Sequence, residues 1–294
     1  MRLYIFGWLF FTLLSSQLLA QDIPNTRVYT FKMVKNGNNF RFTQPRHLTG
    51  FNQEGYNNQP HFVTEETLYL TVQFPDDTQT DIYALNLRRN SISRVTRTVE
   101  GEYSPTRVPS SSSFSAVRVE ADGQNTQRLW QFPMDRSKEG QLVFEDIKGI
   151  GYHQWLSPQK VALFLVDTPS KLMIANRTTG AAVELLNNIG RGLQKMGNEK
   201  LAFIHKVTDD TWVIKELDSQ TYRYKEVIPT LPNSEDFLYL RDGTFLMGKG
   251  SKLYKYNKTF DKDWRQIADF EYYGIKNITR LALSDSGTIA IVSK

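Results

Sequence analysis

The chain has 294 residues, no cysteine, and 36 lysines and arginines against 31 aspartates and glutamates, for a formal net charge of +5. The absence of cysteine excludes disulfides, thiolate catalysis and thiol-ligated metal sites, and a chain of this length can bury a large core without disulfides. Because acidic residues are interleaved with the basic ones throughout, the positive balance does not indicate a nucleic-acid partner.

The N-terminus has the layout of a secretory signal peptide. A single cation, Arg2, precedes an apolar stretch that starts at Leu3, and small and polar residues follow as far as Ala20. The apolar stretch is shorter than the roughly 20 residues that a membrane span needs. We therefore expect residues 1–20 to be a signal peptide and residues 21–294 to be a single domain, periplasmic or secreted, with no membrane insertion of the mature chain.

Strand signals begin soon after the expected cleavage site. Residues 28–33 and 46–49 read as strands, and Asn36-Gly37 is a hairpin turn signal. Short alternating runs rich in Val, Ile, Tyr, Phe and Thr continue along the chain, turn residues separate them, and few stretches have helical spacing. The sequence therefore predicts an all-β protein.

A compact apolar strand, preceded by a polar turn, recurs six times. Its anchor residues are spaced 40 to 47 positions apart, which is the period of four-stranded propeller blades. The anchors are Leu68, Phe114, Val161, Leu201, Phe245 and Ile289.

Each repeat continues with a second recognisable strand and a weaker outer strand, first seen at residues 81–87 and 91–96. The sixth repeat stops at Lys294 after two strands, and residues 28–33 and 46–49 supply the missing third and fourth. We therefore predict a six-bladed β-propeller of four-stranded blades, with the last blade closed by N-terminal strands. A β-sandwich lacks a fixed four-strand repeat, and the capping units of a solenoid have no reason to complement each other.

The repeat resembles that of the TolB-type propellers of the Tol envelope system. The likeness rests on DIYALNL at 81–87, RVT at 94–96 and EYSPT at 102–106. It implies a periplasmic recognition scaffold, of the exported type found in many Bacteroidetes-like bacteria. Two departures separate the chain from TolB itself: the ring begins almost at the cleavage site, where TolB has an additional domain, and the usual Ser-Pro-Asp-Gly turn is eroded.

The sequence shows no catalytic constellation. The four histidines, His47, His61, His153 and His205, have no paired metal-ligand spacing, and neither a G-x-S-x-G elbow nor a phosphate-binding glycine loop is present. We expect no metal, no other cofactor and no catalytic residue. His61 and His153 precede the first strand of their repeats, where the plainest interpretation is a hydrogen bond to backbone at a blade junction.

The segments just before the first strand of each repeat are expected to meet at the mouth of the central channel. Their arginines, histidines and acids suit recognition of a peptide or an acidic group, unless the side chains point outward or pair with each other. The predicted ligand-binding residues are Gln59, His61, Tyr103, Arg107, Tyr152, His153, Arg191, Glu235, Asp236 and Arg280.

These patterns favour a non-enzymatic binding or scaffold protein with a protein or peptide partner in the cell envelope. The alternative is a propeller hydrolase, lactonase or lyase that uses histidines and carboxylates of the channel. A third interpretation is the detached partner domain of an enzyme, since related propellers are often fused to peptidases.

Overall fold

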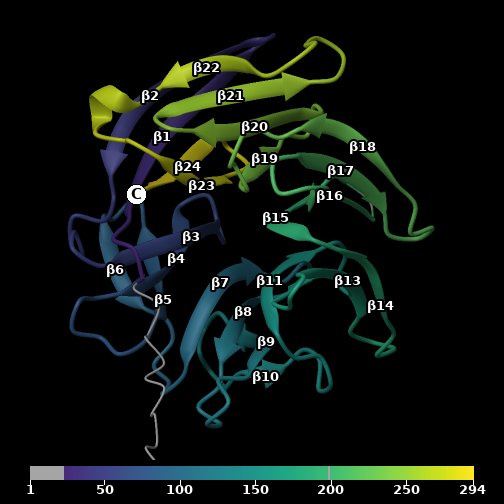
Figure 1. The fold of residues 1–294 in the computed structure, drawn as a ribbon. Coiled ribbons are helices and arrows are strands. Elements are labelled where there is room, and N and C mark those ends of the chain that lie inside the picture. The colour runs from purple at the N-terminus through teal and green to yellow at the C-terminus, as the bar shows by residue number, and fades with distance from the viewer. Residues whose placement is uncertain (1–22, 198) are drawn as a thin grey trace, which may run out of the picture.

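The structure, a computed structural model, describes residues 23–197 and 199–294. In these residues 24 β-strands form six antiparallel four-stranded sheets, arranged as blades round a central channel (Figure 1). The predicted all-β, six-bladed propeller is therefore confirmed. One 3₁₀ turn, η1 (Glu271–Tyr273), interrupts the strands, and no helix within the described part of the chain is long and apolar enough to cross a bilayer.

Five blades are consecutive in the sequence, and in each of them the chain runs from the channel outward. Blade 1 consists of β3 (Tyr56–Phe62), β4 (Thr67–Gln73), β5 (Asp81–Asn86) and β6 (Ser91–Arg94). Blade 2 consists of β7 (Gly101–Arg107), β8 (Ser113–Val119), β9 (Gln127–Pro133) and β10 (Gln141–Leu142). Blade 3 consists of β11 (Ile150–Trp155), β12 (Lys160–Leu165), β13 (Lys171–Asn176) and β14 (Ala182–Asn187).

Blades 4 and 5 follow the same plan. Blade 4 consists of β15 (Ile189–Lys195), β16 (Lys200–Lys206), β17 (Trp212–Asp218) and β18 (Tyr224–Pro229). Blade 5 consists of β19 (Phe237–Tyr239), β20 (Thr244–Lys249), β21 (Lys252–Asn257) and β22 (Arg265–Asp269).

The sixth blade combines the two ends of the described chain. Its inner strands are β23 (Ile278–Leu283) and β24 (Thr288–Ser293), and its outer strands are β1 (Arg27–Asn36) and β2 (Asn39–His47). β1 pairs antiparallel with β24 from Arg27 opposite Ser293 to Lys32 opposite Thr288, and Figure 1 shows the purple pair beside the yellow one. Backbone hydrogen bonds between the first and last strands thus complete the ring.

The compact apolar strand of the repeat is the second strand of each blade, counted from the channel. β4 and β8 each contain five consecutive buried residues, and β24 ends in five. Such runs arise because both faces of the strand pack against neighbouring blades, so apolar residues do not alternate with polar ones. This continuous burial is the reason that these strands stand out in the sequence.

The N-terminal hairpin is also fixed to blade 5. Phe31 on β1 is 1% exposed, and its ring lies 4.6 Å from that of Phe270. The amino group of Lys255 on β21 is fully buried, binds the carboxylate of Asp261 at 2.7 and 2.9 Å, and donates a 2.9 Å hydrogen bond to Asn38 in the hairpin turn. Both apolar and charged contacts therefore join the N-terminal hairpin, β1 and β2, to blade 5.

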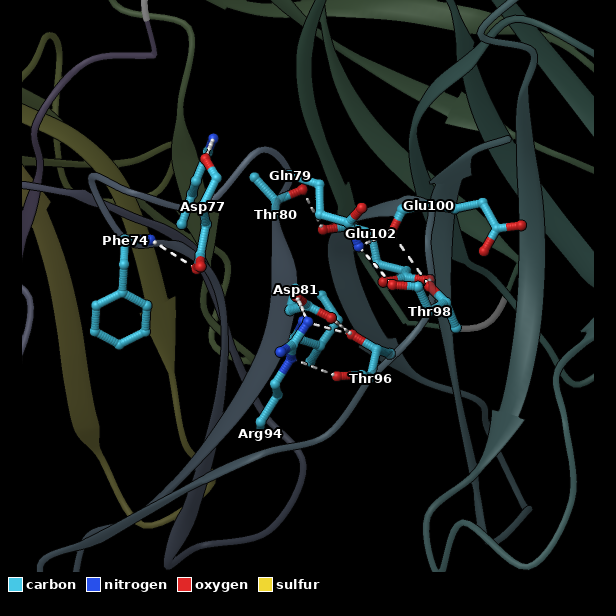
Figure 2. A network of polar contacts seen from close by, with 12 residues as sticks. Phe74, Asp77, Gln79, Thr80, Asp81, Arg94, Thr96, Thr98, Glu100 and Glu102 are labelled. Atoms are coloured by element: carbon cyan, nitrogen blue, oxygen red, sulfur yellow. Dashed lines mark hydrogen bonds and ion pairs between the residues drawn. The ribbon is translucent and has the colours of Figure 1, made fainter. Parts of the chain in front are cut away.

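A polar network joins blades 1 and 2, and it contains four polar residues of the TolB-like repeat motif, Asp81, Arg94, Thr96 and Glu102 (Figure 2). Asp81 binds the guanidinium of Arg94 and accepts a 3.0 Å hydrogen bond from Thr96. Glu102 on β7 is buried beside them, where it binds Arg118 at 3.1 Å and accepts a hydrogen bond from Thr98. These four motif residues therefore have a structural role, because they form hydrogen bonds and ion pairs where two sheets meet.

Closure by β1 predicts a large effect of Phe31→Ala. Truncating this buried ring removes its contacts with Phe270 and leaves a cavity, so the free energy of unfolding should fall by about 3–5 kcal/mol. Val34→Ala on the same strand is the control, because Val34 is 50% exposed and its loss should change stability by no more than about 0.5 kcal/mol. Chemical denaturation measures both. Equal effects of the two variants would show that β1 does not close the ring.

Candidate ligand site in the central channel

The predicted site residues lie on, or just before, the innermost strands. We expected them in segments that precede the first strand of each repeat, but those segments are themselves strands: β3, β7, β11, β15, β19 and β23. Their sequences hid this, because glycine, proline and register shifts interrupt the alternation that marks a strand. In β15 the register slips between Ile189 and Leu193, and β19 has only three residues.

One cavity of about 110 Å³ lies where the innermost strands meet. Seven of the ten predicted residues line it, together with Ser104, Pro105, Thr106 and Gln194. The seven are Gln59, His61, Tyr152, His153, Arg191, Asp236 and Arg280. The geometry of the ring thus brings together residues that are up to 221 positions apart in the sequence.

A cation on blade 6 reaches an aromatic side chain on blade 3, the opposite blade of the ring. Arg280 donates a 2.9 Å hydrogen bond to the hydroxyl of Tyr152, and its guanidinium lies 4.7 Å from the centre of the Tyr152 ring. The Arg280 side chain is 11% exposed. Since the two residues come from opposite blades, their contact spans the channel at the level of the cavity.

Two acids balance part of the positive charge. Asp236 lies 3.7 Å from Arg280 and accepts a 2.9 Å hydrogen bond from the backbone of Leu281. Burial raises the pKa of Asp236, and the neighbouring arginines offset this in part. Glu235 lies 3.7 Å from Arg191 and also pairs with Lys206.

Gly192 lets β15 come close to the segment that carries these acids. A Cβ atom at Gly192 would lie 2.5 Å from the carbonyl oxygen of Glu235, so a larger residue would push the strand away. The adjacent Arg191 then donates a 3.2 Å hydrogen bond to the carbonyl of Thr279 on blade 6. The glycine therefore positions a cation at the cavity.

Two equivalent bulges shape the side of the cavity formed by blades 1 and 2. Gln59 and Ser104 have φ of 52° and 55°, each directly before a proline, and the strand register shifts at both. Left-handed backbone at a residue other than glycine costs about 1–3 kcal/mol and is concentrated at functional sites. The side chain of Gln59 compensates by accepting 2.8 Å hydrogen bonds from Ser104 N–H and Thr71 O–H.

Both channel histidines are neutral at pH 7. Burial lowers the pKa of His61 to about 4, helped by the charge of Arg107, and lowers the pKa of His153 to about 3, helped by His61. His61 Nε2 accepts a 3.0 Å hydrogen bond from the backbone N–H of Arg107, so its proton is on Nδ1. His153 Nε2 lies 2.7 Å from the hydroxyl of Ser115. Each histidine thus contacts the adjacent blade.

Three predicted residues lie outside the cavity. The Arg107 side chain donates to the carbonyl of Val63, Glu235 lines a neighbouring pocket, and Tyr103 lines a third pocket beside Tyr56. Ser104 was missed, although the parallel between Gln59-Pro60 and Ser104-Pro105 is visible in the sequence. Among the residues described, no group of three or more histidines, cysteines and acids is placed to hold a metal ion.

The architecture and the cavity define a six-bladed β-propeller with a polar channel site. No family model and no curated protein matches the chain. By structure it is similar to a putative TolB from Agrobacterium tumefaciens, with a TM-score of 0.67 and 9% identity over 92% of this chain and 98% of that one. TolB from Acinetobacter baumannii has a TM-score of 0.56 and 11% identity over 93% of this chain and 65% of that one.

A chain from a nidogen/laminin complex is similar too, with a TM-score of 0.62 and 10% identity over 92% of this chain and 98% of that one. Similarities at such low identity concern the fold alone. The fold is therefore TolB-like, in agreement with the resemblance in the repeat.

The buried histidines predict a loss of stability in acid. The unfolded chain takes up protons near pH 6.5, whereas the folded His153 does so only at about pH 3. The unfolded state thus binds more protons in between, and His153 alone should cost about 3 kcal/mol of the unfolding free energy between pH 6.5 and pH 4. Denaturation at several pH values should show that the free energy of unfolding falls less steeply with decreasing pH in His153→Gln than in the wild type. The control His47→Gln, at an exposed residue, should change the decline much less, and equal slopes would refute a buried neutral His153.

Proposed function

We propose that this protein is an exported, non-enzymatic binding propeller that recognises a protein or peptide partner of the cell envelope at its channel cavity. The observation that carries the proposal is the convergence of seven polar or aromatic residues, predicted from the repeat, on one cavity. Polar groups that meet at the axis do not stabilise the protein by apolar packing. A concave site with a few convergent polar groups is typical of ligand binding.

The arrangement of the titratable groups supports binding over catalysis. His61 and His153 each use Nε2 to contact the adjacent blade. Asp236 accepts a hydrogen bond from the backbone of Leu281 and forms an ion pair with Arg280. These groups are engaged in fixing the ring. A general base needs a lone pair within reach of a substrate proton, and at Nε2 of His61 the lone pair already accepts the N–H of Arg107.

Export is the second part of the proposal. Its support is the signal-peptide pattern of residues 1–20, which lie outside the described residues, together with the TolB-like fold. N-terminal sequencing of protein recovered from the periplasm or medium of an expressing bacterium should give Gln21 as the first residue. A cytoplasmic protein that retains Met1 would contradict export.

Peptide recognition at the cavity can be tested by selection from a library of random decapeptides with both ends free. Enriched peptides should bind the wild type and Arg241→Ala equally, because Arg241 is exposed and, among the described residues, forms an ion pair only with the exposed Asp285. They should bind Arg191→Ala at least tenfold more weakly, measured by calorimetry. If nothing is enriched, or if the enriched peptides bind all three proteins alike, the channel is not a peptide site.

A further inference from the structure

The cavity has more hydrogen-bond donors than acceptors. Four buried side-chain atoms that line it have no hydrogen-bond partner among the described residues: Nε of Arg191, Nε of Arg280, Nδ1 of His153 and Oγ of Ser104. Each of the two guanidinium groups donates one hydrogen bond to the rest of the described chain, to Thr279 and to Tyr152. Nε of Arg191 still lies 3.7 Å from the carboxylate of Glu235, an ion pair longer than a hydrogen bond. A buried polar group without a hydrogen bond costs about 1–3 kcal/mol, so four at one place need an explanation.

The other channel histidine, His61, supplies a donor. Since Nε2 of His61 accepts from the backbone of Arg107, the neutral ring carries its proton on Nδ1, and no acceptor for that proton is found among the described residues. His61 also lines the cavity. The groups round the cavity thus call for a ligand that accepts several hydrogen bonds.

The local charge favours an anion with a single charge. Arg191, Arg280 and Lys206 stand against Glu235 and Asp236, which leaves one cation in excess. A carboxylate neutralises this excess, whereas a phosphate dianion would leave a net negative charge in a buried place. Guanidinium groups also match the planar geometry of a carboxylate, which they bind through two parallel hydrogen bonds.

The dimensions restrict how such a group arrives. A volume of about 110 Å³ is small beside the roughly 300–1,000 Å³ of common ligand pockets, so the cavity suits one carboxylate and not a whole peptide. The contact between Arg280 and Tyr152 spans the channel at this level. A chain therefore inserts an end or a side chain and does not thread through the ring.

From these observations we infer that the cavity is a subsite for one carboxylate group, bound by the guanidinium groups of Arg191 and Arg280. The group is either the C-terminal carboxylate of a peptide or that of a free small acid. The inference rests on the proposed function for the peptide source, while binding of a free acid would stand without it.

Four probes separate these sources: sodium acetate, inorganic phosphate, N-acetyl-triglycine with a free C-terminus, and the same peptide as its C-terminal amide. Binding is measured by calorimetry and by the shift of the thermal unfolding midpoint, with sodium chloride at equal ionic strength as the reference. Acetate should raise the midpoint more than chloride does, and calorimetry should show acetate bound more tightly than phosphate. The free peptide acid should bind at least tenfold more tightly than its amide.

The variants test the assigned residues. Arg191→Ala should weaken acetate binding at least tenfold, Arg191→Lys should restore part of it, and Arg241→Ala should leave it unchanged. Arg280→Ala, which also removes the contact with Tyr152, is informative only if it folds, and the Arg191 pair keeps the test decisive if it does not.

Three results would overturn the carboxylate subsite: no effect of acetate beyond that of chloride, equal binding of the peptide acid and amide, or undiminished binding of acetate by Arg191→Ala. Equal binding of acid and amide would leave the proposed peptide recognition intact. Acetate binding that depends on Arg191, without binding of either peptide, would support the subsite for a free acid and contradict the peptide function. The failures of the two proposals are therefore distinguishable.

Discussion

The structure depends on the packing of the second strands, which are buried on both faces between neighbouring blades. That packing fixes how far apart the sheets stand and forces a run of apolar residues at each of six positions round the ring. Because each blade buries its neighbours' surfaces, no blade has a complete core of its own. The ring must therefore close, and it closes through backbone hydrogen bonds between β1 and β24.

Closure has a consequence for the axis. Six inner strands converge there. In two of them, β3 and β7, bulges at Gln59 and Ser104 shift the pairing register. Side chains that cannot be packed as a core must satisfy one another across blades, as Arg280 and Tyr152 do. Where such satisfaction is incomplete, as at Arg191, the axis has the donors and the charge to hold a ligand.

The sequence predicted the blades well because their second strands have a local signature. Leu68 and its five equivalents lie in continuous apolar runs, and their spacing alone gave the number of blades. The inner strands lack such a signature: β15 reads Ile-Gly-Arg-Gly-Leu-Gln-Lys, which resembles a loop. Seven site residues were still found, since whatever precedes a second strand must lie nearer the axis.

The errors at the site have the same origin. Side chains on a strand alternate between its two faces, so Arg107 points to Val63 although its neighbour Thr106 lines the cavity. The repeat spacing locates a strand to within a residue or two, but which face a given side chain is on changes with every residue. The spacing also does not show which hydrogen-bond donors lack an acceptor. That information depends on contacts between blades, for example those of Arg191 with Thr279, 88 positions away.

A pair of crystal structures of the protein decides whether the axis is a ligand site or only a junction of blades. One crystal is grown in acetate and the other in chloride at the same ionic strength. If the cavity binds a carboxylate, planar density should lie within hydrogen-bond distance of both Arg191 and Arg280 in acetate alone. Identical density in the two crystals, or guanidinium groups fully bound by protein acceptors, would contradict it.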